Sequence, residues 1–334
     1  MPTALIIGGT RNLGPDLTAA LLEAGFAVSL FHRGVTPPPP LPPGRKAVEF
    51  LHGDRSDASS LAAAIGAREF DAVIDTTLYN GPDAAAAARL FRNGRAGRYV
   101  MLSTGQVYLV RDPAPARPFR ESDYAGATMP HPGATASAFD LDNWTYGVEK
   151  RAAEEALLAE PALPVTILRL PMVNSARDHH YRLKNYVARL RDGGPILLPE
   201  GPDLPVRHVY GPDVVAAVLR AMAGPAGVYN VGQDETLTIE DWLARVAQRC
   251  GVSAGLRIQR VPAARLWELG LLPRCSPFSE PWMSALDNTL GKQALGLRYT
   301  PVNATLDALV PAAMAEGAPP VGYATQRAAE LRCA

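Results

Sequence analysis

The chain of 334 residues has three cysteines, Cys250, Cys275 and Cys333, and no two of them are closely spaced. An odd number of widely separated cysteines argues against a disulfide framework and against a Cys-x-x-Cys metal or redox site. It is typical of a protein in a reducing compartment. No basic segment followed by a long apolar stretch stands at the amino terminus, so we expect no signal peptide. These features predict a cytoplasmic protein.

The sequence also lacks a net charge and a long hydrophobic run. Lys and Arg total 33, as do Asp and Glu, so no charge excess points to nucleic acid or an anionic membrane as a partner. No run of about 18 apolar residues could span a bilayer. With 47% hydrophobic residues, the composition is globular. We therefore expect a small-molecule partner, no nucleic acid and no membrane.

Short apolar runs alternate with helical patterns in the first half of the chain, which predicts a parallel sheet covered on both faces. We expect strands at 4–7, 27–31, 47–51, 72–75, 99–103 and 165–170, with helices at 15–24, 58–65, 82–91 and 144–158. The proline-rich segment 35–43 is interpreted as a surface loop.

The second half is less regular. We expect helices at 181–191, 213–222, 239–250 and 263–272, and a strand at 228–231. Thr238 stands at capping position for the helix at 239–250. The tail beyond Gly317 is interpreted as irregular, apart from a final helical turn near 326–331.

A glycine-rich turn, LIIGGTRNLG at residues 5–14, follows the first expected strand and leads into the first expected helix. Such glycines let the backbone approach a pyrophosphate and let the helix pack closely, and a helix N-terminus offers free N–H groups to phosphates. A merely tight turn is the alternative. We expect the dinucleotide to contact Gly8, Gly9, Thr10, Arg11, Asn12, Leu13 and Gly14.

Two arginines bear on the choice of cofactor. Arg11 stands where such loops often have a central glycine, and Arg33 ends the second strand, where NAD enzymes typically carry an Asp or Glu for the ribose 2′-hydroxyl. Two cations in place of a carboxylate favour NADP(H), while NAD(H) stays open. Asp54 is expected either to bind the adenine amino group or to cap a helix. Asp75 and Thr76 are expected to line the cofactor channel.

Hydroxyl and amine side chains form a candidate catalytic set. Tyr146 and Lys150 are spaced i,i+4 and so share one face of a helix. Ser103 and Thr104 come at the end of the fifth strand, and side chains at the carboxyl end of a parallel strand face the ligand crevice. The set combines a proton donor or acceptor, a cation and a hydrogen-bonding hydroxyl.

With the glycine-rich loop, these elements occur in the order of the extended short-chain dehydrogenase/reductase family, also called the NAD-dependent epimerase/dehydratase family. The sequence resembles that family over most of its length, including LRLP at 168–171, RHV at 207–209 followed by Asp213, and VYNVG at 228–232. The GGTRxxG form of the loop resembles one subgroup of the family.

The resemblance implies specific roles. Tyr146 would be the general acid/base, Lys150 would lower the tyrosine pKa and bind the nicotinamide ribose, and Thr104 would hydrogen-bond the same substrate oxygen. Moving a Tyr pKa from about 10 to about 7 takes roughly 4 kcal/mol, which a nearby cation in a partly dry site can supply. Further cofactor contacts implied by the resemblance are Ser103, Pro171 and Val173.

Dehydratases of the family carry an Asp-Glu pair after the Thr, and this chain has Gly105 and Gln106 there. Neither can act as acid or base, so a dehydration of that type is not expected. Gln106 is an expected substrate contact. So is Arg207, because sugar-nucleotide enzymes of the family carry an arginine on the substrate diphosphate in that region, although its spacing to Asp213 is one residue shorter here.

Other polar residues leave alternatives open. The segment 111–143 is longer than we expect for the family and is either a lid or a surface loop. Lys184 and Arg189 either meet an anionic substrate or are solvated helix cations. His179 and His180 lack further ligands at workable spacing, so no metal site is expected.

These features predict an α/β fold, a Rossmann-type doubly wound parallel sheet with a smaller C-terminal mixed α/β substrate domain. We expect the Rossmann domain at 1–170, with 206–222 packing back on it, and the substrate-binding domain at 171–205 and 223–325. The substrate is expected between the domains. Family analogy suggests a homodimer.

Three functions remain open. The first is an NAD(P)(H)-dependent oxidoreductase that transfers hydride to or from a carbonyl or alcohol carbon of a polar small molecule, sugar-like or a secondary metabolite. The alternative is a nucleotide-sugar epimerase with a retained cofactor, which would use the same catalytic residues. The least favoured is a non-catalytic RNA- or protein-binding Rossmann protein.

Overall fold

The structure is a computed structural model that describes residues 1–37, 48–112, 117–317 and 319–333. It divides into two compact units. The first comprises Met1–Pro171, Gly211–Gly232 and Leu286–Arg298, and the second comprises Met172–Tyr210, Gln233–Ala285 and Tyr299–Ala334. In the part of the chain that the structure describes, no helix is long and apolar enough to cross a membrane.

These units differ in detail from the domains expected from the sequence. Residues 223–232 and 286–298, expected in the substrate domain, belong to the first unit. Residues 206–210, expected on the Rossmann domain, belong to the second. A substrate-binding role for the second unit stays a prediction.

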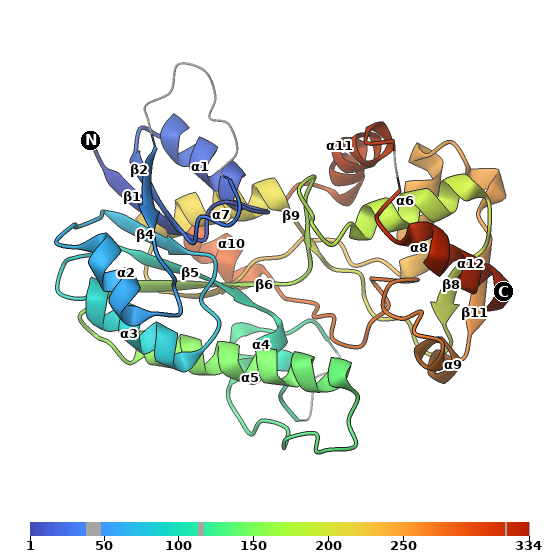
Figure 1. The fold of residues 1–334 in the computed structure, drawn as a ribbon, viewed down its shortest axis with the longest axis horizontal. Helices are drawn as coiled ribbons and strands as arrows, with labels where there is room; N and C mark the ends of the chain where they lie inside the picture. Colours follow the sequence, from blue (N-terminus) through green and yellow to red (C-terminus); the bar gives the residue numbers. More distant parts are fainter. Residues whose placement is uncertain (38–47, 113–116, 318, 334) are drawn as a thin grey trace. The chain divides into compact units, whose positions relative to one another are not determined.

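A seven-stranded sheet with the order β10-β6-β5-β4-β1-β2-β3 forms the centre of the first unit (Figure 1). All six ladders are parallel. The predicted α/β class with a Rossmann-type parallel sheet is therefore confirmed. Its strands are β1 (Thr3–Ile7), β2 (Ala27–His32), β3 (Glu49–His52), β4 (Ala72–Asp75), β5 (Tyr99–Thr104), β6 (Val165–Leu170) and β10 (Gly227–Asn230).

Helices cover both faces of this sheet because the central strands are apolar on both sides, with every residue of β4 and β6 buried. Figure 1 shows α1, α7 and α10 on one face and α2, α3 and α5 on the other. The elements besides the strands are α1 (Gly14–Glu23), α2 (Ala58–Ile65), α3 (Gly81–Phe91), α4 (Gln106–Leu109), η1 (Glu121–Tyr124), α5 (Ala138–Leu158), α7 (Gly211–Ala223) and α10 (Thr289–Leu295).

The segment between β5 and α5 has more order than a structureless lid. Helix α5 begins at Ala138, six residues before the expected start, and Ser137 caps it by accepting a hydrogen bond from the Asp140 N–H at 3.1 Å. The short elements α4 and η1 also lie in the segment. Arg117 holds it by a bidentate pair with Asp123 at 2.7 and 2.9 Å.

The second unit carries two small parallel sheets, β11-β8 and β7-β9. Thr238 caps α8 as the sequence predicts, accepting from the Asp241 N–H at 3.0 Å. Strands β8 and β11 and helix α11 were not expected. The elements are β7 (Val173–Asn174), α6 (Arg182–Asp192), β8 (Ile196–Pro199), β9 (Val209–Tyr210), α8 (Ile239–Arg249), η2 (Ser253–Gly255), β11 (Ile258–Val261), α9 (Ala263–Glu268), α11 (Val302–Ala315) and α12 (Tyr323–Cys333).

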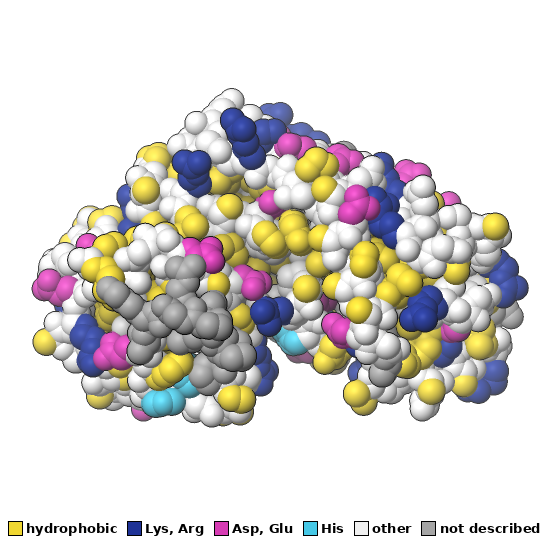
Figure 2. All heavy atoms as spheres, turned by 90° about the horizontal axis from the view of Figure 1, so that it is seen from above, with side chains coloured by type: hydrophobic (Ala, Val, Ile, Leu, Met, Phe, Trp, Pro, Cys, Tyr) yellow, Lys and Arg dark blue, Asp and Glu magenta, His cyan; other side chains and the backbone are white. Residues whose placement is uncertain are grey.

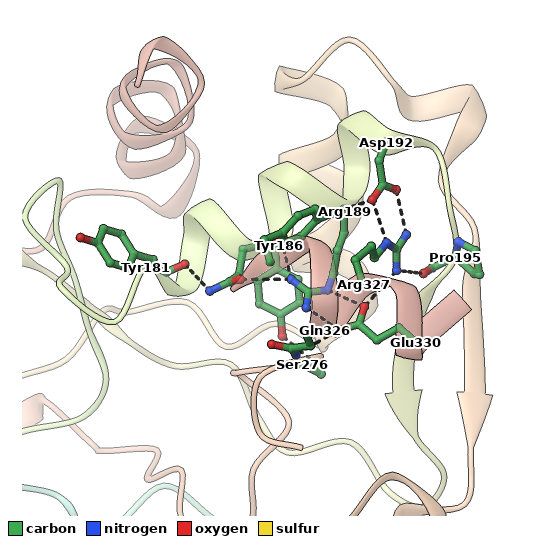
Figure 3. A network of polar contacts seen from close by, with 11 residues as sticks. Tyr181, Tyr186, Arg189, Asp192, Pro195, Ser276, Gln326, Arg327 and Glu330 are labelled. Carbon is green, nitrogen blue, oxygen red and sulfur yellow. Dashed lines mark hydrogen bonds and ion pairs between the residues drawn. The ribbon is translucent and has the colours of Figure 1, made fainter. Parts of the chain in front are cut away.

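The C-terminal tail is more regular than expected: the final helical turn expected near 326–331 is part of the longer helix α12 at 323–333, which packs on α6 through buried ion pairs (Figure 3). Arg189 is fully buried and donates to both carboxylate oxygens of Glu330, at 2.5 and 3.0 Å. Arg327 bridges Glu330 at 3.0 Å and Asp192 at 2.7 and 2.8 Å. Arg189 is thus neither a solvated cation nor available to a substrate.

We predict that Glu330→Gln lowers the free energy of unfolding of the second unit by about 3–5 kcal/mol, because it leaves the buried Arg189 guanidinium without its counter-charge. Urea titration followed by circular dichroism measures the change. Glu316→Gln is the matched control, since Glu316 pairs with Lys184 as a half-exposed carboxylate, and it should cost at most about 1 kcal/mol. Equal losses in the two variants would contradict the prediction.

Candidate active site

The glycine-rich loop joins β1 to α1 in a turn that leaves no room for a side chain at Gly8 or Gly14. Gly8 has φ +88°, and a Cβ on it would lie 2.3 Å from Thr77 Cγ2. A Cβ on Gly14 would lie 2.3 Å from the carbonyl carbon of Gly9. The loop therefore brings bare backbone to the start of α1, which is the cradle that a pyrophosphate group requires.

The loop is tied to the end of β4. The Thr76 hydroxyl donates to the carbonyls of Ile7 and Gly8 at 3.0 and 3.1 Å. Asn12 also has a positive φ, 48°. Thr76 thus supports the loop, as well as standing where a cofactor channel is expected.

The two arginines expected to favour NADP(H) both have exposed side chains. Arg11 Nε donates to the Thr36 hydroxyl at 2.8 Å, beyond the end of β2. Arg33 directly follows β2, and no described residue forms an ion pair with it. Both guanidinium groups are therefore accessible to a ligand phosphate.

Asp54 is exposed, and its carboxylate accepts from the Ser56 N–H at 2.9 Å. The cap of α2 is Asp57, which accepts from the N–H groups of Ser59 and Ser60. The helix-capping alternative for Asp54 is therefore wrong, and contact with an adenine group stays a prediction.

Asp75 does not face a channel. Its carboxylate is fully buried, where it accepts from Arg55 Nη2 at 2.9 Å, from the Tyr99 hydroxyl at 2.7 Å and from the Thr77 N–H at 3.0 Å. Burial and this anion together raise the pKa of Tyr99. Asp75 thus belongs to a buried ion pair behind the edge of the sheet, which corrects the expectation from its position in the sequence.

The structure brings Thr104 and Tyr146 together. Thr104 is the last residue of β5, and its hydroxyl lies near enough to the Tyr146 phenol of α5 to lower the pKa of that phenol. The ring of Tyr79 lies 6.3 Å from that of Tyr146, centroid to centroid. Burial raises the pKa of Tyr146 to about 12, against a smaller lowering by Thr104. The phenol is neutral in this arrangement.

Lys150 lies one turn along α5 and is almost fully buried. Its Nζ donates to the backbone carbonyls of Leu78 and Leu102 at 2.8 Å each and lies 5.6 Å from the centroid of the Tyr79 ring. Burial lowers the lysine pKa to about 8, although the carboxylates of Glu154 and Asp75 oppose that shift. Lys150 is not among the groups that shift the Tyr146 pKa, so activation of the phenol by Lys150 stays a prediction.

Two expected contacts are committed to other side chains. The Gln106 amide donates to Asn143 Oδ1 at 2.7 Å and to the Asn143 carbonyl at 3.1 Å. The Ser103 hydroxyl is buried and donates to Glu154. Both side chains therefore brace the site, and a direct contact with substrate or cofactor would need these bonds to be exchanged.

The remaining expected residues divide between the units. Pro171 is the last residue of the first segment of the first unit, whereas Val173 and Arg207 lie in the second unit. Arg207 donates to the Asp234 carbonyl and the Thr236 hydroxyl at 3.0 Å each. Over the described ranges, no group of three or more His, Cys, Asp and Glu side chains could hold a metal ion.

Sequence reasoning missed Tyr79, Arg55 and Glu154. Tyr79 follows an apolar strand in a loop, and its position carries no sequence signal. Glu154 stands four residues beyond Lys150, so the i,i+4 rule that pairs Tyr146 with Lys150 also places Glu154 on that helix face. Arg169, a lone charge within the apolar strand β6, signals a buried partner.

With this geometry established, comparison with known proteins identifies the class. A model of the NAD dependent epimerase/dehydratase family matches residues 4–232. The chain therefore belongs to the NAD dependent epimerase/dehydratase family. The expected family resemblance is confirmed at this level.

Individual relatives are distant. The chain is 24% identical over 260 residues to chloroplast stem-loop binding protein of 41 kDa b from Arabidopsis thaliana, an alignment that covers 74% of this chain and 62% of that protein. The chain thus spans less than two thirds of the length of this curated relative.

Solved structures share the fold. WbmG from Bordetella bronchiseptica, in complex with NAD and UDP, has a TM-score of 0.71 at 19% identity and covers 94% of each chain. UDP-glucose 4-epimerase from Thermotoga maritima, with UDP-glucose, has a TM-score of 0.69 at 17% identity and covers 94% of this chain and 99% of its own.

The buried Lys150 predicts a pH-dependent stability. Its folded pKa of about 8 lies below the ordinary value of 10.5, so burial of the cation costs free energy at low pH and that cost disappears as pH rises. We predict that the free energy of unfolding, wild type minus Lys150→Met, increases by about 3 kcal/mol between pH 7 and pH 10.5. Urea titrations of both proteins across that range test this. Parallel profiles would show that Lys150 has an ordinary pKa.

Proposed function

We propose that this protein is an epimerase of nucleotide-linked sugars that retains its nicotinamide cofactor. The observation that carries the proposal is the Thr104 hydroxyl at the end of β5 near the Tyr146 phenol of α5, with the Lys150 ammonium one helical turn further along that helix. Family membership supports it. So do the two structural neighbours described above, WbmG with NAD and UDP and UDP-glucose 4-epimerase with UDP-glucose.

The glycine loop fits a dinucleotide, because a Cβ at Gly8 or Gly14 would occupy the space that the turn requires. The loop backbone and the start of α1 would hold the cofactor, and Lys150, which donates to the carbonyls of Leu78 and Leu102, would use its remaining proton to bind the ribose. When bound, the nicotinamide supplies reversible hydride transfer at a carbinol carbon.

The proton chemistry belongs to the chain's own residues. The hydroxyls of Thr104 and Tyr146 would contact the same substrate oxygen, and the deprotonated Tyr146 would take the hydroxyl proton as a carbonyl forms there and return it when the alcohol is restored. For this role the pKa of Tyr146 must fall from its raised value to about 7, and a cation near the phenol favours that fall.

Epimerisation would need no second acid or base, because Tyr146 could take the proton and return it to the same oxygen whichever face of the ketone is reduced. This fits a site in which Thr104 is followed by Gly105 and by Gln106, whose amide is hydrogen-bonded to Asn143. A dehydration would need a carboxylic acid there.

A second candidate is a reductase or dehydrogenase that exchanges its cofactor at each turnover and prefers NADP(H). The exposed Arg11 of the glycine-rich loop and Arg33 after β2 support it, since a 2′-phosphate takes charge-assisted hydrogen bonds from such groups. The two candidates share Thr104, Tyr146 and Lys150, and they differ in whether the cofactor leaves.

Nucleic-acid binding is the least supported function. The Arabidopsis relative is named for binding a stem-loop, and such proteins generally present a basic surface. Figure 2 shows Lys and Arg side chains interspersed with Asp and Glu side chains on the face in view. The net charge is zero.

The epimerase proposal makes a prediction about turnover. Tyr146→Phe should lower kcat about 10²- to 10⁴-fold, the usual worth of a general acid/base, in the interconversion of UDP-glucose with its C4 epimer followed by proton NMR. Tyr181→Phe removes an exposed hydroxyl in the second unit and should leave kcat unchanged. The cofactor released by denaturation and identified by chromatography should be near-stoichiometric in all three proteins. An empty wild-type protein would refute the retained-cofactor proposal and favour the second candidate.

The second candidate function makes a prediction about Arg11 and Arg33. Arg11→Ala combined with Arg33→Ala should weaken NADPH binding about ten- to a hundredfold, the worth of the charge-assisted hydrogen bonds lost, and leave NADH binding unchanged. Fluorescence titration measures both. Arg68→Ala, which removes an exposed cation paired with Glu49, is the control. A protein that binds NADH more tightly from the start would refute the phosphate role.

A further inference from the structure

Glu154 lies at the centre of a buried network directly behind the candidate active site. It is fully buried on α5, one helical turn beyond Lys150. Its carboxylate accepts from Arg169 Nη2 at 2.6 Å and from Arg169 Nε at 3.1 and 3.2 Å. It also accepts from the hydroxyl of Ser103, the residue before Thr104.

We propose that Glu154 is a positioning residue for the function proposed above: it fixes the strand end that carries Thr104 and places a buried negative charge beside the Lys150 ammonium. The positioning of Thr104 rests on the hydrogen bonds that Glu154 forms with Ser103 and Arg169. The effect on Lys150 rests on the i,i+4 spacing that puts the two side chains on one face of α5.

The network holds the polypeptide on both sides of Thr104. On the preceding side, Glu154 binds Ser103 directly. On the following side, Arg169 Nη1 donates to the Tyr108 hydroxyl at 2.8 Å, and that hydroxyl donates to Asn230 Oδ1 at 2.7 Å. The β5–α4 turn that presents the Thr104 hydroxyl is therefore anchored to α5, β6 and β10 at once.

The same carboxylate acts on Lys150 through space. Burial lowers the lysine pKa, Glu154 opposes this most, Asp75 of β4 opposes it less, and Arg55 adds to it. One further group faces the ammonium, the Tyr79 ring. Asp75 is balanced by Arg55 within its own buried pair.

A purely structural ion pair between α5 and β6 is the competing explanation. It predicts a loss of stability when the pair is broken and no change in Lys150. The proposal predicts a change in the protonation of Lys150 that survives when stability is restored.

The chain has four lysines, Lys46, Lys150, Lys184 and Lys292, so their ¹³Cε resonances can be followed individually in protein labelled at lysine. The Lys150 resonance is assigned by its loss in Lys150→Met. In Glu154→Gln we expect the Lys150 pKa to fall by about one unit or more, because a close opposite charge is removed. Glu155→Gln is the matched control: Glu155 is the next residue on the helix, exposed and bonded to the Tyr124 hydroxyl, and it should leave that pKa unchanged.

Glu154→Gln leaves Arg169 buried without a counter-charge, which can prevent folding. The pair Glu154→Gln with Arg169→Met removes both charges, a replacement that buried ion pairs often tolerate, and circular dichroism verifies its fold. We expect the lowered Lys150 pKa in this variant too, whereas Glu154→Asp, which keeps the charge, should largely restore the wild-type value. An unchanged Lys150 pKa in the folded double variant would overturn the proposal.

This measurement requires no turnover, so it is independent of the proposed function. If the Lys150 pKa does not change in the Glu154 variants while Tyr146→Phe loses activity, only the role of Glu154 is refuted. If the Lys150 pKa falls as expected in the Glu154 variants while Tyr146→Phe stays active, only the epimerase proposal is refuted.

Discussion

The first unit depends on a buried ammonium that joins helix α5 to strand β5 and to the loop after β4. Lys150 Nζ donates to the carbonyls of Leu78, just beyond β4, and Leu102, within β5. Because burying a cation is costly unless its protons are satisfied, these bonds fix the register of α5 along the carboxyl edge of the sheet. Tyr146, one turn earlier, is thereby placed beside Thr104. The candidate catalytic pair follows from that single constraint.

Buried charges recur in the protein, and each joins elements that are distant in sequence. The pair of Arg55 and Asp75 links the loop after β3 to β4, and the pair of Arg189 and Glu330 links α6 to α12. Such pairs contribute little net stability compared with apolar residues, yet leaving one partner alone is expensive. They therefore specify which elements meet, and the hydrophobic core supplies most of the stabilisation.

Much of the first unit was predictable, because its information is local. The expected elements at 58–65, 72–75 and 165–170 match α2, β4 and β6 residue for residue, since apolar runs of strand length alternate with capped helices. The glycine loop was predictable because a steric requirement selects glycine at particular positions. In contrast, α12 has little apolar periodicity, and its packing depends on Arg189, which lies more than a hundred residues earlier.

The sequence by itself determined the class of fold, the family and the identity of the residues that stand at the carboxyl ends of the strands. Periodicity and motif order are properties of neighbouring residues, so they survive without coordinates. Only the tertiary structure decided what each polar side chain contacts. Asp75, Gln106 and Ser103 stand at positions that suggest ligand binding, but they are committed to Arg55, Asn143 and Glu154. The reason is physical: a buried polar group must find a partner, and that partner comes from a distant element that no local pattern names.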